Sequence, residues 1–197
     1  MANKLYNILV PVDFTNKNKW AITKAIELSN SFNCNIHLVY VTGKRRSFFV
    51  RDSNIEISLK KLEQLKALYK NQLCGEGSLE ISVLGGSRQK QLAKYILQYE
   101  MDLVVTGLSK FNFVQRIISS VSISRLAKKT NIPVLAIRSG GLVCHFKKIV
   151  LPVSGEVPMR QIRFAALLGR AFKSTVYFVS LRKHADDKSQ GILDSAL

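Results

Sequence analysis

Polar side chains and glycines follow several short apolar segments of the sequence, at places where a ligand could be contacted. Asp13 follows the segment Ile8–Val12, and Gly107 closes the segment 102–107. Ligands of open parallel sheets bind beyond the carboxyl ends of the strands, so these residues are candidates for one shared site. Asp13 could accept a hydrogen bond from an amine or a hydroxyl group, or face a metal–phosphate group. The alternative is that Asp13 caps a helix or closes a turn.

Three serines form a second polar group where a helix is expected to begin. They are Ser119, Ser120 and Ser122. The free backbone N–H groups and the dipole at such a helix start could hold a phosphate group. The alternative is an ordinary serine N-cap.

A basic and aromatic segment is the third candidate. The chain carries 30 Lys and Arg against 13 Asp and Glu, a formal charge of +17, which favours attraction of polyanions such as nucleic acid or anionic lipid. In this segment, cations could pair with phosphates while the rings stack on bases or insert into a membrane surface. The alternatives are a solvated lysine-rich surface and a loop whose phenylalanines fold back onto a helix. The residues predicted to contact a polyanion are Lys44, Arg45, Arg46, Phe48, Phe49 and Arg51.

No pattern typical of an enzyme is present. His37, His145 and His184 lack triad or metal spacing to a cysteine or serine, and the three cysteines form no C-x-x-C pair. We therefore expect no catalysis, no zinc site and no disulfide framework. The odd cysteine count, the absence of an apolar signal region and the lack of an apolar run of about 20 residues favour a cytoplasmic protein without a transmembrane segment.

Apolar segments alternate with segments of helical periodicity. Short apolar strands separated by helices are typical of an α/β domain with a parallel sheet. Strands are predicted at 6–12, 35–41, 79–84, 102–106 and 133–138, and helices at 17–32, 53–74, 87–99 and 120–130. Thr15 or Asn16 is expected to cap the first helix, and Gly75 and Gly77 to end the second.

The beginning of the chain recurs later. Residues 7–13 match residues 148–154 at an offset of 141, and the match continues through a helix and a strand at an offset of 140. Such a long period indicates a duplicated domain rather than a solenoid. We predict a complete domain at 1–139, a linker at 140–146 and a β-α-β portion of a second copy at 147–197. A lone β-α-β unit exposes a strand face and edges, which favours a homodimer or higher homo-oligomer.

The first 139 residues resemble the universal stress protein family. The resemblance is carried by the opening strand Ile8–Asp13, by Asp102–Gly107, and by Ser119–Ser122 leading through Arg125-Leu126-Ala127 to Ile132–Arg138. It implies an open five-stranded parallel sheet with helices on both faces, related to the adenine nucleotide alpha hydrolase fold, and frequent dimerisation. The two-part layout is similar to tandem members, with the second domain incomplete.

One branch of that family binds ATP through the motif G-x-x-G, nine residues, then G-[ST]. Here Gly107 matches the first glycine, but Lys110 and Ser119 replace the others, and the gap between them is eight residues. Losing glycines is unfavourable because backbone N–H groups must approach the phosphates closely. The nucleotide contacts implied by the resemblance and the strand ends are Pro11, Asp13, Val41, Gly107, Lys110, Ser119, Ser120, Val121 and Ser122.

The sequence thus predicts a non-catalytic stress-response or regulatory protein with a degenerate, weak or absent ATP site. Two alternatives remain open at this point. One is a functional ATP-binding switch, with ATP and Mg²⁺ as possible ligands. The other is a polyanion-binding protein that acts through its basic surface.

Overall fold

The computed structural model describes residues 4–43, 51–108, 123–138, 146–153 and 159–180. The chain divides into two compact units. The first unit comprises residues 5–142, and the second comprises residues 143–197 together with 1–4. Each unit has its own parallel sheet.

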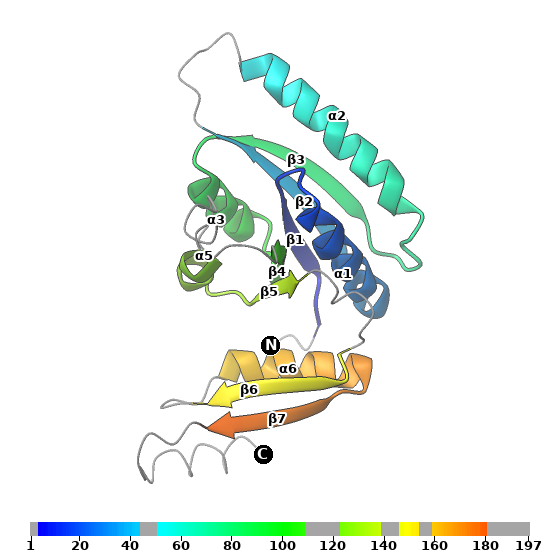
Figure 1. Ribbon diagram of the computed structural model, residues 1–197, viewed down its shortest axis with the longest axis vertical. Helices are drawn as coiled ribbons and strands as arrows, with labels where there is room; N and C mark the ends of the chain where they lie inside the picture. Colours follow the sequence, from blue (N-terminus) through cyan, green and yellow to red (C-terminus); the bar gives the residue numbers. More distant parts are fainter. Residues whose placement is uncertain (1–3, 44–50, 109–122, 139–145, 154–158, 181–197) are drawn as a thin grey trace. The chain divides into compact units, whose positions relative to one another are not determined.

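The first unit is built on a five-stranded parallel sheet. Its strands are β1 (Asn7–Val12), β2 (Asn35–Thr42), β3 (Leu79–Gly85), β4 (Leu103–Leu108) and β5 (Val134–Arg138). Their order in the sheet is β3-β2-β1-β4-β5, so the direction of winding reverses at β1 and β4 (Figure 1). This confirms the predicted fold class.

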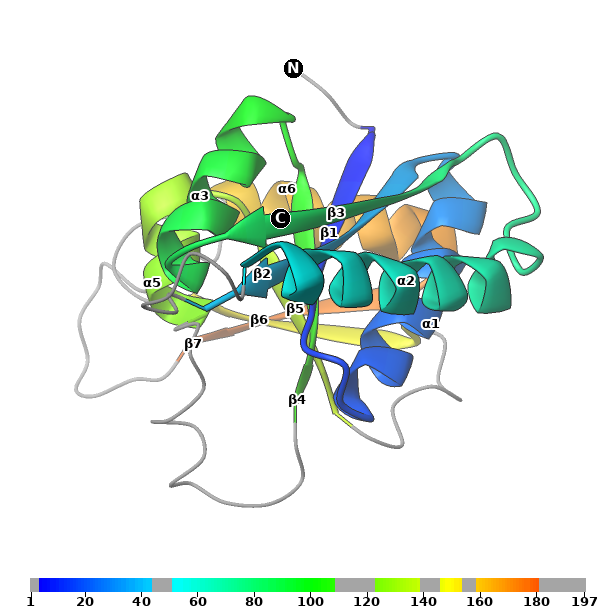
Figure 2. The same ribbon diagram turned by 90° about the horizontal axis from the view of Figure 1, so that it is seen from above.

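Helices cover both faces of this sheet. They are α1 (Lys17–Phe32), α2 (Arg51–Lys70), α3 (Arg88–Gln98) and α5 (Ile123–Thr130). Helices α1 and α2 lie on one face, whereas α3 and α5 lie side by side on the other (Figures 1 and 2). Because side chains alternate along a strand, each strand between two helical layers must be apolar on both sides. Strand β1 meets this requirement, since Ile8, Leu9 and Val10 are fully buried.

An apolar core lies between the sheet and helices α3 and α5. Leu92, Tyr95 and Ile96 of α3 and Leu126 of α5 pack on Leu9, Val39, Val41 and Val104 of the sheet. The helical spacing of these residues brings one apolar side of α3 onto the strands. Val41, one of the predicted nucleotide contacts, is therefore part of this core by its side chain.

Strands β1 and β4 are neighbours over a short distance only. Strand β1 pairs with β2 from Asn7 to Val12, but its ladder with β4 consists of Ile8–Leu103 and Leu9–Val104. The amino ends of the two strands are held together by Asp102, whose carboxylate accepts hydrogen bonds from the backbone N–H groups of Tyr6 and Asn7 at 2.8 and 2.9 Å. Beyond Leu9 the two strands diverge toward their carboxyl ends.

The second unit consists of a strand, a helix and a second strand. Strand β6 (Lys148–Val153) is followed by α6 (Met159–Phe172) and β7 (Thr175–Ser180), and the two strands pair in parallel. Ala165 and Leu168 of α6 and Leu151 of β6 are buried, whereas Val150, Tyr177 and Val179 on the other face of the strands are exposed. The predicted β-α-β arrangement is confirmed for these elements.

The end of α2 differs from the sequence prediction. The helix ends at Lys70 rather than near Cys74. Asn30 of α1 donates its side-chain N–H to the carbonyl of Gln72 and accepts from the backbone N–H of Cys74. These contacts with α1 hold the backbone in a turn, so the helical pattern of the sequence is not followed to the glycines.

Candidate functional site

The turn between β1 and α1 is organised around Asp13. One carboxylate oxygen, Oδ1, accepts from the backbone N–H of Thr15 at 3.0 Å and from its hydroxyl at 2.5 Å. In the amide orientation that satisfies its neighbours, Asn18 donates to the same oxygen at 2.9 Å and accepts from the N–H groups of Asp13 and Phe14. Asp13 thus stabilises the turn, as the structural alternative predicted. Its other oxygen, Oδ2, accepts no hydrogen bond from the described residues and is the one left for a ligand.

Phe14 completes this turn in an unusual backbone conformation. Its φ of 56° lies in the left-handed region, which a non-glycine residue rarely adopts. The ring packs against Tyr40 of β2 with 4.6 Å between centroids, and the ammonium of Lys61 lies 5.5 Å from its centroid. These contacts hold the ring over the ends of β1 and β2 and offset the backbone strain.

Gly107 lies in β4, where the start of α1 approaches the sheet. A Cβ atom at this position would come within 2.2 Å of the Lys17 carbonyl oxygen. Glycine is therefore required for packing between β4 and α1. The group that approaches Gly107 is a hydrogen-bond acceptor and offers no donor to a phosphate.

Pro11 lies in the part of β1 that has diverged from β4. It pairs with Val39 of β2 and has no N–H to donate, so it suits a stretch without a strand on its other side. Asp13, Gly107 and the start of α1 therefore gather at the switch point between β1 and β4, where ligands of such sheets bind. The structure brings Asp13 and Gly107 to the same end of the sheet, and their assignment as ligand contacts stays a prediction.

The other predicted nucleotide and polyanion contacts lie outside what the structure describes. Arg51 begins α2, but its side chain is not described. The remaining residues fall in undescribed segments of the chain: Lys44, Arg45, Arg46, Phe48, Phe49, Lys110, Ser119, Ser120, Val121 and Ser122.

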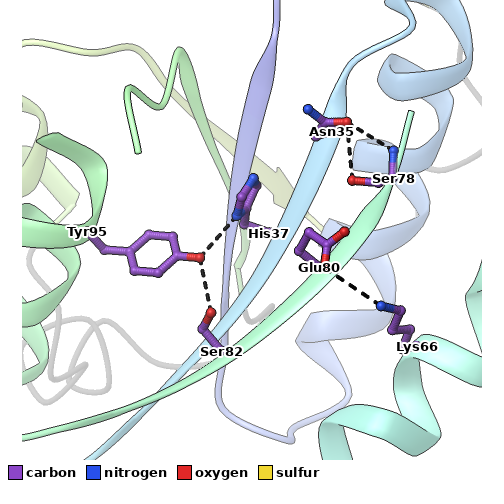
Figure 3. Close-up of polar contacts among 7 residues, drawn as sticks. All are labelled: Asn35, His37, Lys66, Ser78, Glu80, Ser82 and Tyr95. Atoms are coloured by element: carbon purple, nitrogen blue, oxygen red, sulfur yellow. Dashed lines mark hydrogen bonds and ion pairs between the residues drawn. The ribbon is translucent and has the colours of Figure 1, made fainter. Parts of the chain in front are cut away.

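A separate polar cluster joins β2, β3 and α3 (Figure 3). The Tyr95 hydroxyl lies 3.0 Å from His37 Nδ1 and 3.1 Å from the Ser82 hydroxyl. Burial lowers the pKa of His37, and the neighbouring carboxylate of Glu80 opposes this shift. Glu80 is itself 3.8 Å from the ammonium of Lys66. Among the described residues, the hydrogen bonds of this cluster involve one histidine and no cysteine.

The two described thiols differ in their exposure to solvent. Cys34 is buried, and desolvation raises its pKa to about 12, so the thiol is protonated at neutral pH. Cys74 is exposed in the loop after α2. Within the described ranges, no group of three or more His, Cys, Asp or Glu side chains could hold a metal ion.

Comparisons with known proteins agree with this geometry. A sequence model of the universal stress protein family matches residues 5–138, which include all five strands of the first unit. The chain belongs to the universal stress protein family. No curated protein sequence matches the chain.

Solved structures of that family share its fold. Universal stress protein UspA from Lactobacillus plantarum is 19% identical, covers 68% of this chain and 99% of its own length, and superposes with a TM-score of 0.53. A universal stress protein solved in complex with cAMP gives 12% identity, 68% and 97% coverage, and a TM-score of 0.52. A universal stress protein from Archaeoglobus fulgidus covers 98% of this chain and 72% of its own, with 11% identity and a TM-score of 0.72.

The sequence prediction missed three residues of the switch point. Asn18 bonds to Asp13, Phe14 adopts the left-handed turn, and the Lys17 carbonyl approaches Gly107. Asn18 follows Asp13 by five residues in a polar segment, which was a usable sign of a side-chain-stabilised turn. The approach of Lys17 to Gly107 has no local sequence signal because it depends on tertiary packing.

We predict that Gly107→Ala lowers the free energy of unfolding by about 1–3 kcal/mol, since the added methyl group must displace the start of α1. Urea denaturation followed by circular dichroism measures the change. Gly43→Ala is the matched control, because a Cβ there meets no described residue within 4 Å beyond its chain neighbours. Equal stabilities for the two variants would contradict the packing role of Gly107.

The His37 cluster predicts a pH dependence of stability. Because the folded pKa lies below the ordinary value of 6.5, the unfolded chain binds the proton more readily. The unfolding free energy should therefore fall as the pH is lowered from 6.5 toward the folded pKa. His37→Gln should reduce this slope in denaturation curves measured across that range. Identical slopes for both proteins would show that His37 does not titrate differently on folding.

Proposed function

We propose that this chain is a non-catalytic, regulatory universal stress protein whose switch-point site no longer holds ATP in the manner of the motif-bearing branch. The observation that carries the proposal is the replacement of two motif glycines by Lys110 and Ser119, across a gap that is one residue short. Side chains at these positions would keep backbone N–H groups from approaching a phosphate closely.

A nucleotide-binding switch is the second candidate function. It is favoured by the free Oδ2 of Asp13 at the switch point, which could accept a hydrogen bond from a ribose hydroxyl. A universal stress protein with this fold has been solved in complex with cAMP. ATP with Mg²⁺ is the ligand to test first.

Calorimetric titration of Mg-ATP into the protein at near-physiological salt separates the two candidates. We expect no saturable heat from the unaltered chain, because the phosphates lack the backbone donors that the motif glycines expose. The double variant Lys110→Gly/Ser119→Gly restores these glycines and should bind more tightly than the unaltered chain if the lost glycines are the cause. Binding of about one nucleotide per chain by the unaltered protein, lost in Asp13→Ala, would establish the switch instead.

Assembly is the second part of the proposal. In the first unit, α3 covers the strand face that includes Leu9 and Val39. The matching positions in the second unit are Val150 and Val179, which are 62% and 41% exposed. Among the described residues, β6 and β7 pair with no further strand. We propose that this face and these edges are covered by a second copy of the chain. We also propose a tandem-type layout for the chain, which is supported by the Archaeoglobus fulgidus structure because the similarity extends over 98% of this chain.

Light scattering at micromolar concentration should give at least twice the monomer mass of 22.1 kDa. Val150→Lys/Tyr177→Lys should shift the mass toward the monomer, because charges would then lie within the covered face. Leu68→Lys is the matched control, since Leu68 is 64% exposed on α2 of the first unit. A monomeric unaltered protein would refute the proposed assembly.

None of the helices among the described residues has the length and apolar character needed to cross a membrane. We retain the cytoplasm as the proposed location on the sequence features given above.

A further inference from the structure

Helices α3 and α5 carry basic residues and no acidic ones. Helix α3 contains Arg88, Lys90 and Lys94, and α5 contains Arg125, Lys128 and Lys129. Neither helix includes Asp or Glu. The two helices lie side by side on one face of the first unit (Figures 1 and 2), so their charges add to one surface, the α3/α5 face.

The lysines of the α3/α5 face are available to a partner. Lys90, Lys94, Lys128 and Lys129 are all exposed, because the opposite sides of the helices pack into the core. No acidic side chain of the described residues forms an ion pair with any of the four. Asp102, shortly after α3, is engaged with the backbone of β1 and does not offset them.

The opposite face of the same sheet has mixed charge. Helices α1 and α2 include Glu27, Asp52, Glu56 and Glu63 among their lysines. Lys24 pairs with Glu27, Lys60 with Glu56, and Lys66 with Glu80. The charged residues of the first unit are therefore balanced differently in its two helical layers, since α3 and α5 contain no Asp or Glu to balance their cations.

We propose that the α3/α5 face binds the phosphate backbone of a nucleic acid duplex without reading its sequence. Lys90 and Lys94 are four residues apart on one helix, about 6 Å along its axis, and packed helices lie about 8–10 Å apart. A duplex carries one phosphate charge per about 1.7 Å of its axis, so several phosphates lie within reach of four lysines on two adjacent helices. Neutralising backbone phosphates releases counterions, which drives this kind of binding.

A membrane surface fits this face less well. Binding in a membrane interface requires an apolar helix side that can enter the lipid. The apolar residues Leu92, Tyr95 and Ile96 of α3 and Leu126 of α5 are buried against the sheet. Leu97 is the exposed large apolar residue of α3, and it is insufficient to insert the helix.

The test is fluorescence anisotropy of a labelled DNA duplex, with an RNA duplex of the same sequence run in parallel to tell which is preferred. The variant Lys90→Gln/Lys94→Gln/Lys128→Gln/Lys129→Gln removes the four lysines of the α3/α5 face. The matched control, Lys60→Gln/Lys61→Gln/Lys66→Gln/Lys70→Gln, removes the same charge from α2. Circular dichroism confirms that both variants are folded.

We expect the unaltered protein to bind the duplex with an affinity that falls steeply between about 50 and 200 mM salt. The α3/α5 variant should lose at least about tenfold in affinity, and its slope of log K against log salt should decrease by about 0.9 for each lost phosphate contact. The α2 control should keep most of the affinity and the slope. Equal losses in both variants, no binding of either duplex, or binding of phosphatidylserine vesicles instead would overturn the proposal.

Discussion

In the first unit, the arrangement of residues at the carboxyl ends of the strands depends on how soon β1 separates from β4. The two strands share only two residue pairs, next to the Asp102 carboxylate that holds their amino ends together. Once they diverge, the space at the switch point must be closed by the start of α1. That closure requires a tight turn at Asp13 and Phe14 and a residue without a side chain at position 107. The turn at Asp13 and the glycine at position 107 would also be part of a nucleotide site, but packing alone already requires both of them.

Because the same residues serve both packing and a possible ligand site, the sequence could predict only part of this site. The alternation of apolar strands and periodic helices was enough to predict the five strands and the limits of α1, because burial on both faces leaves a clear pattern. It also placed Asp13 and Gly107 at one sheet end. The partners of these residues, Asn18 and the Lys17 carbonyl, come from packing of α1 on the sheet, and the early end of α2 depends on Asn30. Such tertiary contacts leave little trace in local composition.

The two helical layers of the first unit both cover the sheet, but their charged residues differ. Each layer covers one side of β1, yet ion pairs lie along α1 and α2, while α3 and α5 contain lysines and no Asp or Glu. Packing constrains the inward residues of a helix and leaves the outward ones free to vary. In the second unit, Leu151, Ala165 and Leu168 are buried between α6 and the strands, whereas the other face of these strands has no helix over it among the described residues of that unit.

The burial of Cys34 has a consequence for a cell exposed to peroxide. Oxidation of a thiol to sulfenic acid requires the thiolate and access of the oxidant, and Cys34 offers neither because its pKa is raised to about 12. Cys74 lies exposed in a loop, where an added oxygen disturbs no core packing. Of the two described cysteines, an oxidant would therefore reach Cys74 before Cys34, and a modified Cys74 would leave the packing around Cys34 unchanged.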